Sequence, residues 1–218
     1  MKNITITLAI LFIALFANAQ ENSTGNNDKT VTLFGHAKEV KLGWFVGSDN
    51  TYTKFCKRDV YMSGLNAGLI LNHNYSVGFS ASGWSNRKTM YFNNGADSTG
   101  AYLEGGFGRL LLEYTMNPQS LIHVTFPLMI GAGGARYFTV NDNNNWESND
   151  WNTHENTIET DVFFSVEPGI RAELNVFKFM RFNAGVSYRY VSGLELRNTS
   201  KDMLNNFTAN VGLKFGKF

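Results

Sequence analysis

The sequence lacks most of the features that would place it in a common soluble class. It has 218 residues, and the single cysteine cannot form an internal disulfide, which excludes a disulfide-stapled scaffold. Only 17% of the residues are charged and the formal net charge is +1, which argues against a nucleic-acid binder that neutralises phosphates. Its mean hydropathy is negative, which argues against a helical membrane protein, because such a protein needs stretches of about 20 apolar residues. Glycine, with 21 residues, and the aromatics, at 14%, are abundant instead.

The first 19 residues have the features of a cleaved signal peptide. Lys2 is followed by an apolar core over 6–16 and by the small-x-small sequence of residues 17–19. An N-terminal anchor helix is the alternative, and the absence of cysteine at the cleavage point argues against a lipoprotein. Residues 20–31 are polar and small, as in a flexible periplasmic segment, and residues 32–218 are expected to form one exported domain.

The exported domain shows a period of two, which predicts β-strands. Apolar residues alternate with polar residues or glycine over 75–81, 121–132, 162–174, 180–190 and 207–215, and less regularly over 38–47, 59–71 and 102–115. These are eight segments of about ten residues, and a tilted strand needs about 9–11 residues to cross a bilayer. Pro127 and Pro168 fall inside two of them, where each should cost a ladder hydrogen bond or mark a bulge.

The connections between these strands alternate in length. Tight turns are expected at 72–74, 115–120 and 175–178, and long polar loops at 47–58, 85–100, 136–159 and 192–204. This alternation is typical of an up-and-down barrel with one plain rim and one elaborated rim. With an even number of strands after export, both termini are predicted to be periplasmic.

Alternation alone does not say which face is inside, because a soluble lipocalin-like calyx also has eight strands, with its apolar face inward. Three features favour a membrane barrel with a polar lumen. Glycine concentrates on the polar face, where a narrow barrel has little room. Charges on that face nearly balance and would pair in the lumen; they are Glu39, Lys41, Arg109, Glu113, Glu167, Arg171, Glu173, Arg181, Arg189 and Lys214. Aromatics near the strand ends suit membrane interfaces; they are Trp44, Tyr61, Tyr75, Tyr102, Tyr114, Tyr188 and Tyr190.

The last predicted strand, residues 206–218, makes the sequence resemble a known family of proteins. With the export signal and the eight alternating segments, it resembles small outer-membrane β-barrels of the OmpA/OmpX-like kind, whose final strand ends in an aromatic residue. The resemblance implies an all-β, closed, antiparallel, up-and-down transmembrane barrel of eight strands. It also implies that the barrel-assembly machinery reads a signal made of Phe207, Val211, Leu213, Phe215 and Phe218. Phe218 is out of step by one residue, so either the signal ends at Phe215 or a bulge lies near Gly216.

Few residues have the spacing of a chemical site. The glycines of 131–134 do not lead into a helix, and the four histidines lack metal-ligand spacing. Ser76, Glu113 and His123 would have to meet near one strand end to form a hydrolase triad. In the loop 136–159, calcium binding by acidic residues and surface contacts by Trp146 and Trp151 are weak alternatives to a solvated loop. Arg87 and Lys88 could meet anionic lipid headgroups, and Cys56 is interpreted as a free thiol.

The favoured interpretation is a monomeric outer-membrane barrel without enzymatic activity, cofactor or metal. It would contact lipid, have its lumen closed by ion pairs, and bind a surface partner through the loops at 85–100 and 136–159. A lipid-modifying enzyme on the same barrel and a soluble calyx that binds an apolar ligand are the alternatives.

Overall fold

The computed structural model describes residues 41–55, 58–94, 97–141, 154–197 and 199–218. The predicted signal peptide, the segment 20–31, Glu39 and Cys56 lie outside this part of the chain. So do the side chains of Arg87, Lys88 and the acidic and tryptophan residues singled out between 142 and 155. Within it, no helix is long and apolar enough to span a membrane.

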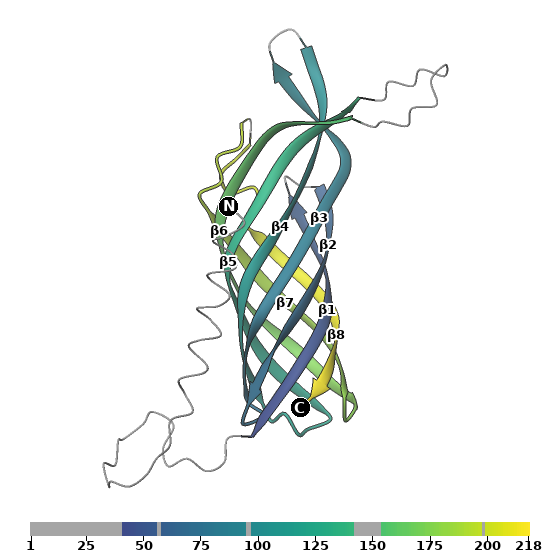
Figure 1. Ribbon diagram of the computed structural model, residues 1–218, viewed down its shortest axis with the longest axis vertical. Coiled ribbons are helices and arrows are strands. Elements are labelled where there is room, and N and C mark those ends of the chain that lie inside the picture. The colour runs from purple at the N-terminus through teal and green to yellow at the C-terminus, as the bar shows by residue number, and fades with distance from the viewer. Residues whose placement is uncertain (1–40, 56–57, 95–96, 142–153, 198) are drawn as a thin grey trace, which may run out of the picture. The chain divides into compact units, whose positions relative to one another are not determined.

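Eight antiparallel strands form a closed barrel in chain order, with β8 pairing back to β1 (Figure 1). The strands are β1 (Leu42–Phe55), β2 (Arg58–Leu71), β3 (Tyr75–Asn94), β4 (Asp97–Met116), β5 (Ile122–Asn141), β6 (His154–Phe177), β7 (Met180–Ser192) and β8 (Asn206–Lys217). The predicted all-β, up-and-down, eight-stranded barrel is therefore confirmed.

One end of the barrel, which we call the turn end, carries the three tight turns and the C-terminus. Asn72, His73 and Asn117 have φ values of 52°, 65° and 49°. The left-handed region is more accessible to asparagine than to most residues because its short side chain can hydrogen-bond locally. The side-chain Oδ1 of Asn72 also accepts a hydrogen bond from the backbone of Lys41 at 3.2 Å, which ties the first turn to the start of β1.

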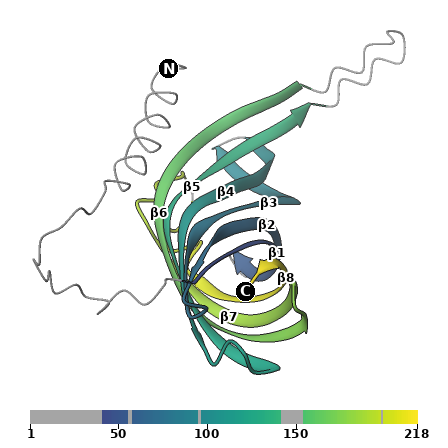
Figure 2. The ribbon, with the colours of Figure 1, turned by 60° about the horizontal axis from the view of Figure 1, so that its bottom comes forward.

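At the opposite end, which we call the loop end, strand covers most of two of the four predicted long loops and both ends of a third. β1 and β2 continue to residues 55 and 58, and β3 to β6 continue beyond the rest of the barrel (Figures 1 and 2). The loop predictions at 47–58, 85–100 and 136–159 were therefore wrong for much of their length. Strict alternation is lost in these stretches, which combine polar runs such as 48–51 with consecutive apolar residues such as 90–92. The backbone ladder does not depend on that alternation and continues through them.

Pro127 and Pro168 lie inside strands, as predicted, and interrupt the ladder between β5 and β6. Thr125 pairs with Arg171 and Leu128 with Pro168, and no pair is formed between these two positions. The register is the same on both sides of the interruption, so the prolines cost pairing without adding a bulge.

The apolar face of the strands points outward. Tyr61 and Phe207 are about three-quarters exposed, whereas Arg109, Glu167 and Lys214 are buried in the interior. A calyx needs the reverse arrangement, so the calyx interpretation does not fit this barrel. The glycines predicted to line the interior do so: a Cβ at any of ten positions would lie within 3.0 Å of another atom. These are Gly43, Gly64, Gly68, Gly78, Gly105, Gly131, Gly133, Gly169, Gly185 and Gly212.

Candidate functional site in the barrel interior

The interior holds two groups of buried ion pairs, and the first is centred on Glu167 of β6. Its Oε2 accepts hydrogen bonds from Arg109 of β4 at 2.6 Å and from Arg189 of β7 at 2.8 Å. The hydroxyl of Ser187 donates to its Oε1 at 2.6 Å. Both guanidinium groups lie over the ring of Phe107, 4.8 and 4.7 Å from its centroid. One carboxylate thus holds three strands together across the interior.

The second group lies nearer the turn end and is centred on Lys214 of β8. Its Nζ donates to both carboxylate oxygens of Glu113 at 2.9 Å and to Glu173 at 2.7 Å. The other oxygen of Glu173 lies 3.2 Å from Nε2 of His123 and 3.6 Å from Arg181. Strands β4, β5, β6, β7 and β8 therefore meet in this group.

Arg171 and Asp49 complete the interior network. Their charged groups are 3.2 Å apart, Arg171 also lies 3.9 Å from Glu113, and Asn66 donates to Asp49 at 2.7 Å. Sequence reasoning missed Asp49 because it was assigned to a loop. It continues the alternate positions of Gly43, Phe45 and Gly47, and that continuation was the available signal.

Eight of the ten predicted lumen residues lie in this network. Glu39 is outside the described residues. Lys41 is exposed, because it precedes β1 at the turn end and no strand directs its side chain inward. The lumen position predicted for Lys41 is therefore wrong.

Little space is left between the charged side chains. A cavity of about 10 Å³ is bounded by Asp49, Arg109, Glu167, Arg171 and Asn210, among others. Asp49 Oδ1, Arg109 Nε, Arg171 Nε and Asn210 Oδ1 have no hydrogen-bond partner among the described residues. The volume and the polar lining suit a single water molecule, which would satisfy some of these atoms.

The loop-end half of the interior is apolar, which the sequence did not indicate. Rings from several strands gather there: Phe55 packs against Trp84 and Trp84 against Phe107, with centroids 5.5 and 5.0 Å apart. Residues 193–197 and 199–205, between β7 and β8, cover this cluster and bury four side chains in it: Leu194, Leu196, Met203 and Leu204. We call this segment the cap.

The cap is also fixed by polar contacts with the ends of neighbouring strands. The Asn205 side chain accepts from the Val191 backbone at 2.6 Å, and the Tyr137 hydroxyl lies 2.8 Å from that of Thr199. Carboxylates of β6 accept from the cap backbone, Asp161 from Glu195 and Glu159 from Arg197. The cap therefore lies over the apolar cluster at the loop end, and the ion pairs occupy the interior on the turn-end side of that cluster.

At the turn end, Phe218 packs inside the barrel mouth against Phe45, Ile70, Leu111 and Met129. The guanidinium of Arg181 lies 3.9 Å from its ring centroid. Trp44 pairs with Lys217 and Phe45 with Gly216 in an unbroken register, so there is no bulge at Gly216. Phe218 is out of step simply because it points inward, whereas Phe207, Val211, Leu213 and Phe215 point outward.

Six of the seven predicted interface aromatics are exposed on the outer surface, and Tyr102 is half-buried against Phe138, with centroids 5.5 Å apart. Trp44, Tyr75 and Tyr114 lie toward the turn end, with the last two in contact at 5.3 Å. Tyr61, Tyr188 and Tyr190 lie toward the loop end, where Tyr188 contacts Phe207 at 5.0 Å. The apolar surface thus has an aromatic band toward each end.

The residues considered for catalysis are not joined into a triad. Ser76 and Glu113 are cross-strand partners, but Glu113 binds Lys214 and both nitrogens of His123 contact other groups. No hydrogen bond joins Ser76 to either residue in the described part of the chain. No group of three metal-ligating side chains occurs there.

Comparison with solved structures shows the same architecture in other proteins. The barrel is similar to Neisserial surface protein A (TM-score 0.51, 14% identity), covering 83% of this chain and all of that one. OprG from Pseudomonas aeruginosa gives a TM-score of 0.47 at 12% identity, covering 80% of this chain and 95% of that one. No protein-family model and no curated protein matches the sequence. The likeness to Neisserial surface protein A confirms the small outer-membrane type of eight-stranded barrel as the fold.

Proposed function

We propose that this protein is an integral outer-membrane barrel whose role is exerted at its loop end. The observation that carries the proposal is the reversed polarity of the barrel. Large apolar side chains such as Phe79, Val162 and Phe207 are half or more exposed, while charged side chains fill the interior. A contiguous apolar surface of this extent is not sustained in water by a monomer, and a bilayer is the environment that matches it.

The proposed orientation places the turn end and both termini in the periplasm and the loop end outside. The interior would be closed to solutes by three layers: Phe218 at the turn end, the ion pairs, and the cap. Wide aqueous pores are found in barrels of about 16 strands or more, in keeping with a closed interior here. The assembly machinery would act on the outward residues of β8 during insertion.

The role that fits this arrangement is surface contact or binding by the hairpins that extend beyond the membrane. The described parts of 85–100 and 136–159 belong to those hairpins, and both ranges remain the predicted partner-binding regions. Neisserial surface protein A, which has the same fold, is by its name a surface protein. We propose no enzymatic activity, because Glu113 and His123 are committed to other contacts.

Fractionation of cells that express the full chain tests the proposal. The protein should stay with the outer membrane after salt and carbonate washes and require detergent for release. On gels it should migrate faster unheated than boiled, as a closed barrel does. Trypsin added to intact cells should cleave loop-end sites and leave the turn end protected. Release into the aqueous fraction would overturn the membrane location.

A further inference from the structure

Four glycines lie on the outer surface, and packing within the barrel does not require glycine at three of them. They are Gly83 of β3, Gly106 and Gly108 of β4, and Gly134 of β5. A Cβ at Gly108 would meet nothing within 4 Å, and one at Gly83 or Gly134 would lie 3.6 Å from its nearest atom. At Gly106 it would lie 3.0 Å from the Ser82 carbonyl oxygen, so the wall itself is tight there. Glycine in mid-strand weakens a sheet and often marks a place where another molecule or backbone approaches closely. The reason for Gly83, Gly108 and Gly134 therefore lies outside the barrel wall.

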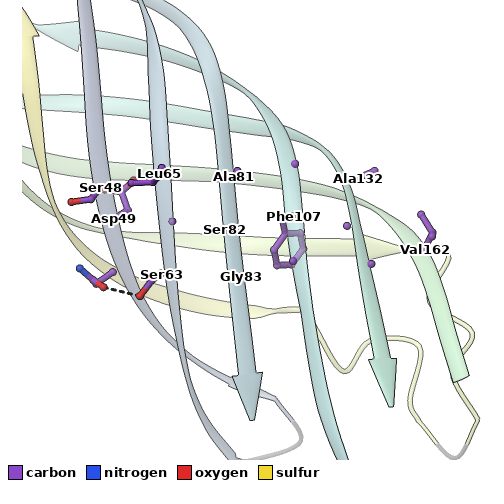
Figure 3. Close-up of a pocket in the computed structure, with 16 residues that line it drawn as sticks. Ser48, Asp49, Ser63, Leu65, Ala81, Ser82, Gly83, Phe107, Ala132 and Val162 are labelled. Carbon is purple, nitrogen blue, oxygen red and sulfur yellow. Dashed lines mark hydrogen bonds between the residues drawn. The ribbon is translucent and has the colours of Figure 1, made fainter. Parts of the chain in front are cut away.

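The strand register puts these residues side by side. Gly83 pairs with Gly106 and Gly106 with Gly134, and in the adjoining row Ala81 pairs with Gly108 and Gly108 with Ala132. Together they form the floor of a hollow of about 810 Å³ on the outer face, seen in Figure 3 with Leu65 and Val162 at its sides. We call this hollow the glycine trough.

The trough lies between two rows of different chemistry. On its turn-end side the paired row of Phe79, Leu110 and Ile130 belongs to the apolar outer surface. On its loop-end side Glu104 pairs across the strands with Arg136, and their side chains form an ion pair. The trough therefore occupies the position at which an acyl chain would meet its headgroup.

A second hollow of about 390 Å³ adjoins the trough and shares Gly83 and Gly134 with it. Arg136, Thr160 and Trp84 are among its lining residues. The ring of Trp84 points into the barrel interior, so the polar groups that this hollow offers on the outer surface are those of Thr160, Glu104 and Arg136. An oxygen-bearing group that enters it would bring an acceptor for the Arg136 guanidinium, which also pairs with Glu104.

We propose that the glycine trough binds one acyl chain of a phosphate-bearing lipid of the outer leaflet, with the ester and phosphate groups at the second hollow. The inference rests on the proposed membrane location. From β1 to β6 the trough spans about 24 Å, five strand spacings, and two residue rows make it about 7 Å wide, which suits a single extended chain. A second copy presenting its own trough would leave a void, because two concave surfaces do not fill each other.

The experiment compares two matched pairs of substitutions in the full-length protein. Gly108→Leu with Ala132→Leu fills the trough at one cross-strand pair. Ala172→Leu with Ala184→Leu adds the same side chains at a cross-strand pair of β6 and β7, away from the trough. Each purified protein is freed of lipid in detergent, mixed with dipalmitoyl phosphatidylglycerol, and examined by native mass spectrometry. The wild type and the β6–β7 variant should retain one lipid, and the trough variant should bind at least tenfold more weakly.

Further measurements distinguish a bound lipid from the other possible occupants of the trough. Arg136→Gln should weaken retention of phosphatidylglycerol but leave retention of the uncharged dipalmitoylglycerol unchanged. Equal retention by all variants would overturn the proposal, and so would a wild-type dimer that only the trough variant loses, since a second copy would then be the occupant. If the double variant lacks the heat-modifiable gel shift, it has not folded, and Ala132→Leu alone then replaces it as the test variant. A membrane-integral protein that retains no lipid would refute the trough alone and leave the proposed location intact.

Discussion

At the scale of single residues, this barrel separates glycines that its packing demands from glycines that it does not. Gly131 illustrates the first kind, because a Cβ there would lie 2.3 Å from the Gly108 carbonyl oxygen and 2.6 Å from Arg109 Cα. Neither neighbour is the flexible end of a side chain, so the strands themselves would have to move. The narrow interior therefore restricts positions such as Gly131 to glycine, just as the ion pairs restrict other interior positions to charged residues.

The two kinds of glycine should respond oppositely to the same methyl group. Gly131→Ala should lower the free energy of unfolding by about 1–3 kcal/mol through overpacking. Gly108→Ala should leave it unchanged or raise it by about 0.5–1 kcal/mol, because alanine loses less conformational entropy on folding. Urea titration of the two variants and the wild type in one and the same lipid, followed by gel mobility, measures both changes in the free energy of unfolding. Equal destabilisation by the two alanines would contradict the distinction.

Glu167 is the residue whose neutralisation should cost most in the interior. Glu167→Gln would leave Arg109 and Arg189 buried without a counter-charge, and breaking a buried pair in this way typically costs about 3–5 kcal/mol. The matched control is Glu195→Gln in the cap, since Glu195 and Lys201 form an exposed pair worth at most about 1 kcal/mol. The same urea titration should separate them. A loss below about 1 kcal/mol for Glu167→Gln would show that water compensates the two guanidinium groups.

At the scale of elements, the sequence predicts strands well only where their two faces differ. All eight strands follow from alternation, since each presents bulky apolar residues outward and glycine or charged residues inward. The extensions of β3 to β6 do not, because their polar and apolar residues do not alternate: in β3, residues 86–89 are all polar and residues 90–92 are all apolar. Asp49 was lost for the same reason. The cap was missed because its four apolar residues lie in a segment without regular structure, although the pairs Leu194–Leu196 and Met203–Leu204 interrupt an otherwise polar stretch.

The cap should loosen independently of the barrel beneath it. Leu194 and Leu204 are almost fully buried in the apolar cluster, and truncating one such leucine typically costs about 2–5 kcal/mol. In Leu194→Ala with Leu204→Ala, trypsin should therefore cleave at Arg197 and Lys201 faster than in the wild type, while the barrel keeps its unheated gel mobility. Mass spectrometry of the fragments locates the cuts. Leu65→Ala with Leu69→Ala on the outer surface serves as the control, and its cleavage rate at the cap should match the wild type.

At the scale of the whole molecule, residues far apart in the chain must come together to fill the interior. Lys214 reaches Glu113, 101 positions earlier, and Glu173, 41 positions earlier. The sequence predicts which side chains face inward but not their partners, because pairing depends on the stagger of all eight strands around the closed barrel. The sequence could thus predict that the interior charges nearly balance. It could not predict that the ion pairs divide into two groups, that the interior beneath the cap is apolar, or that Phe218 points inward.

The proposed closure of the interior by separate layers predicts a low conductance. Reconstituted in planar bilayers, the wild type should show no large, stable current, because the ion-pair region leaves a cavity of only about 10 Å³ among the described residues. The cap variant with both leucines truncated should also remain closed, since the groups centred on Glu167 and Lys214 lie below the cap. Adding Lys214→Ala to that variant removes the side chain that binds Glu113 and Glu173. Large current should still be absent, because the group centred on Glu167 and the ring of Phe218 stay in place. Current through the cap variant alone would place the barrier in the cap, whereas stable current through the wild type would refute the closed interior altogether.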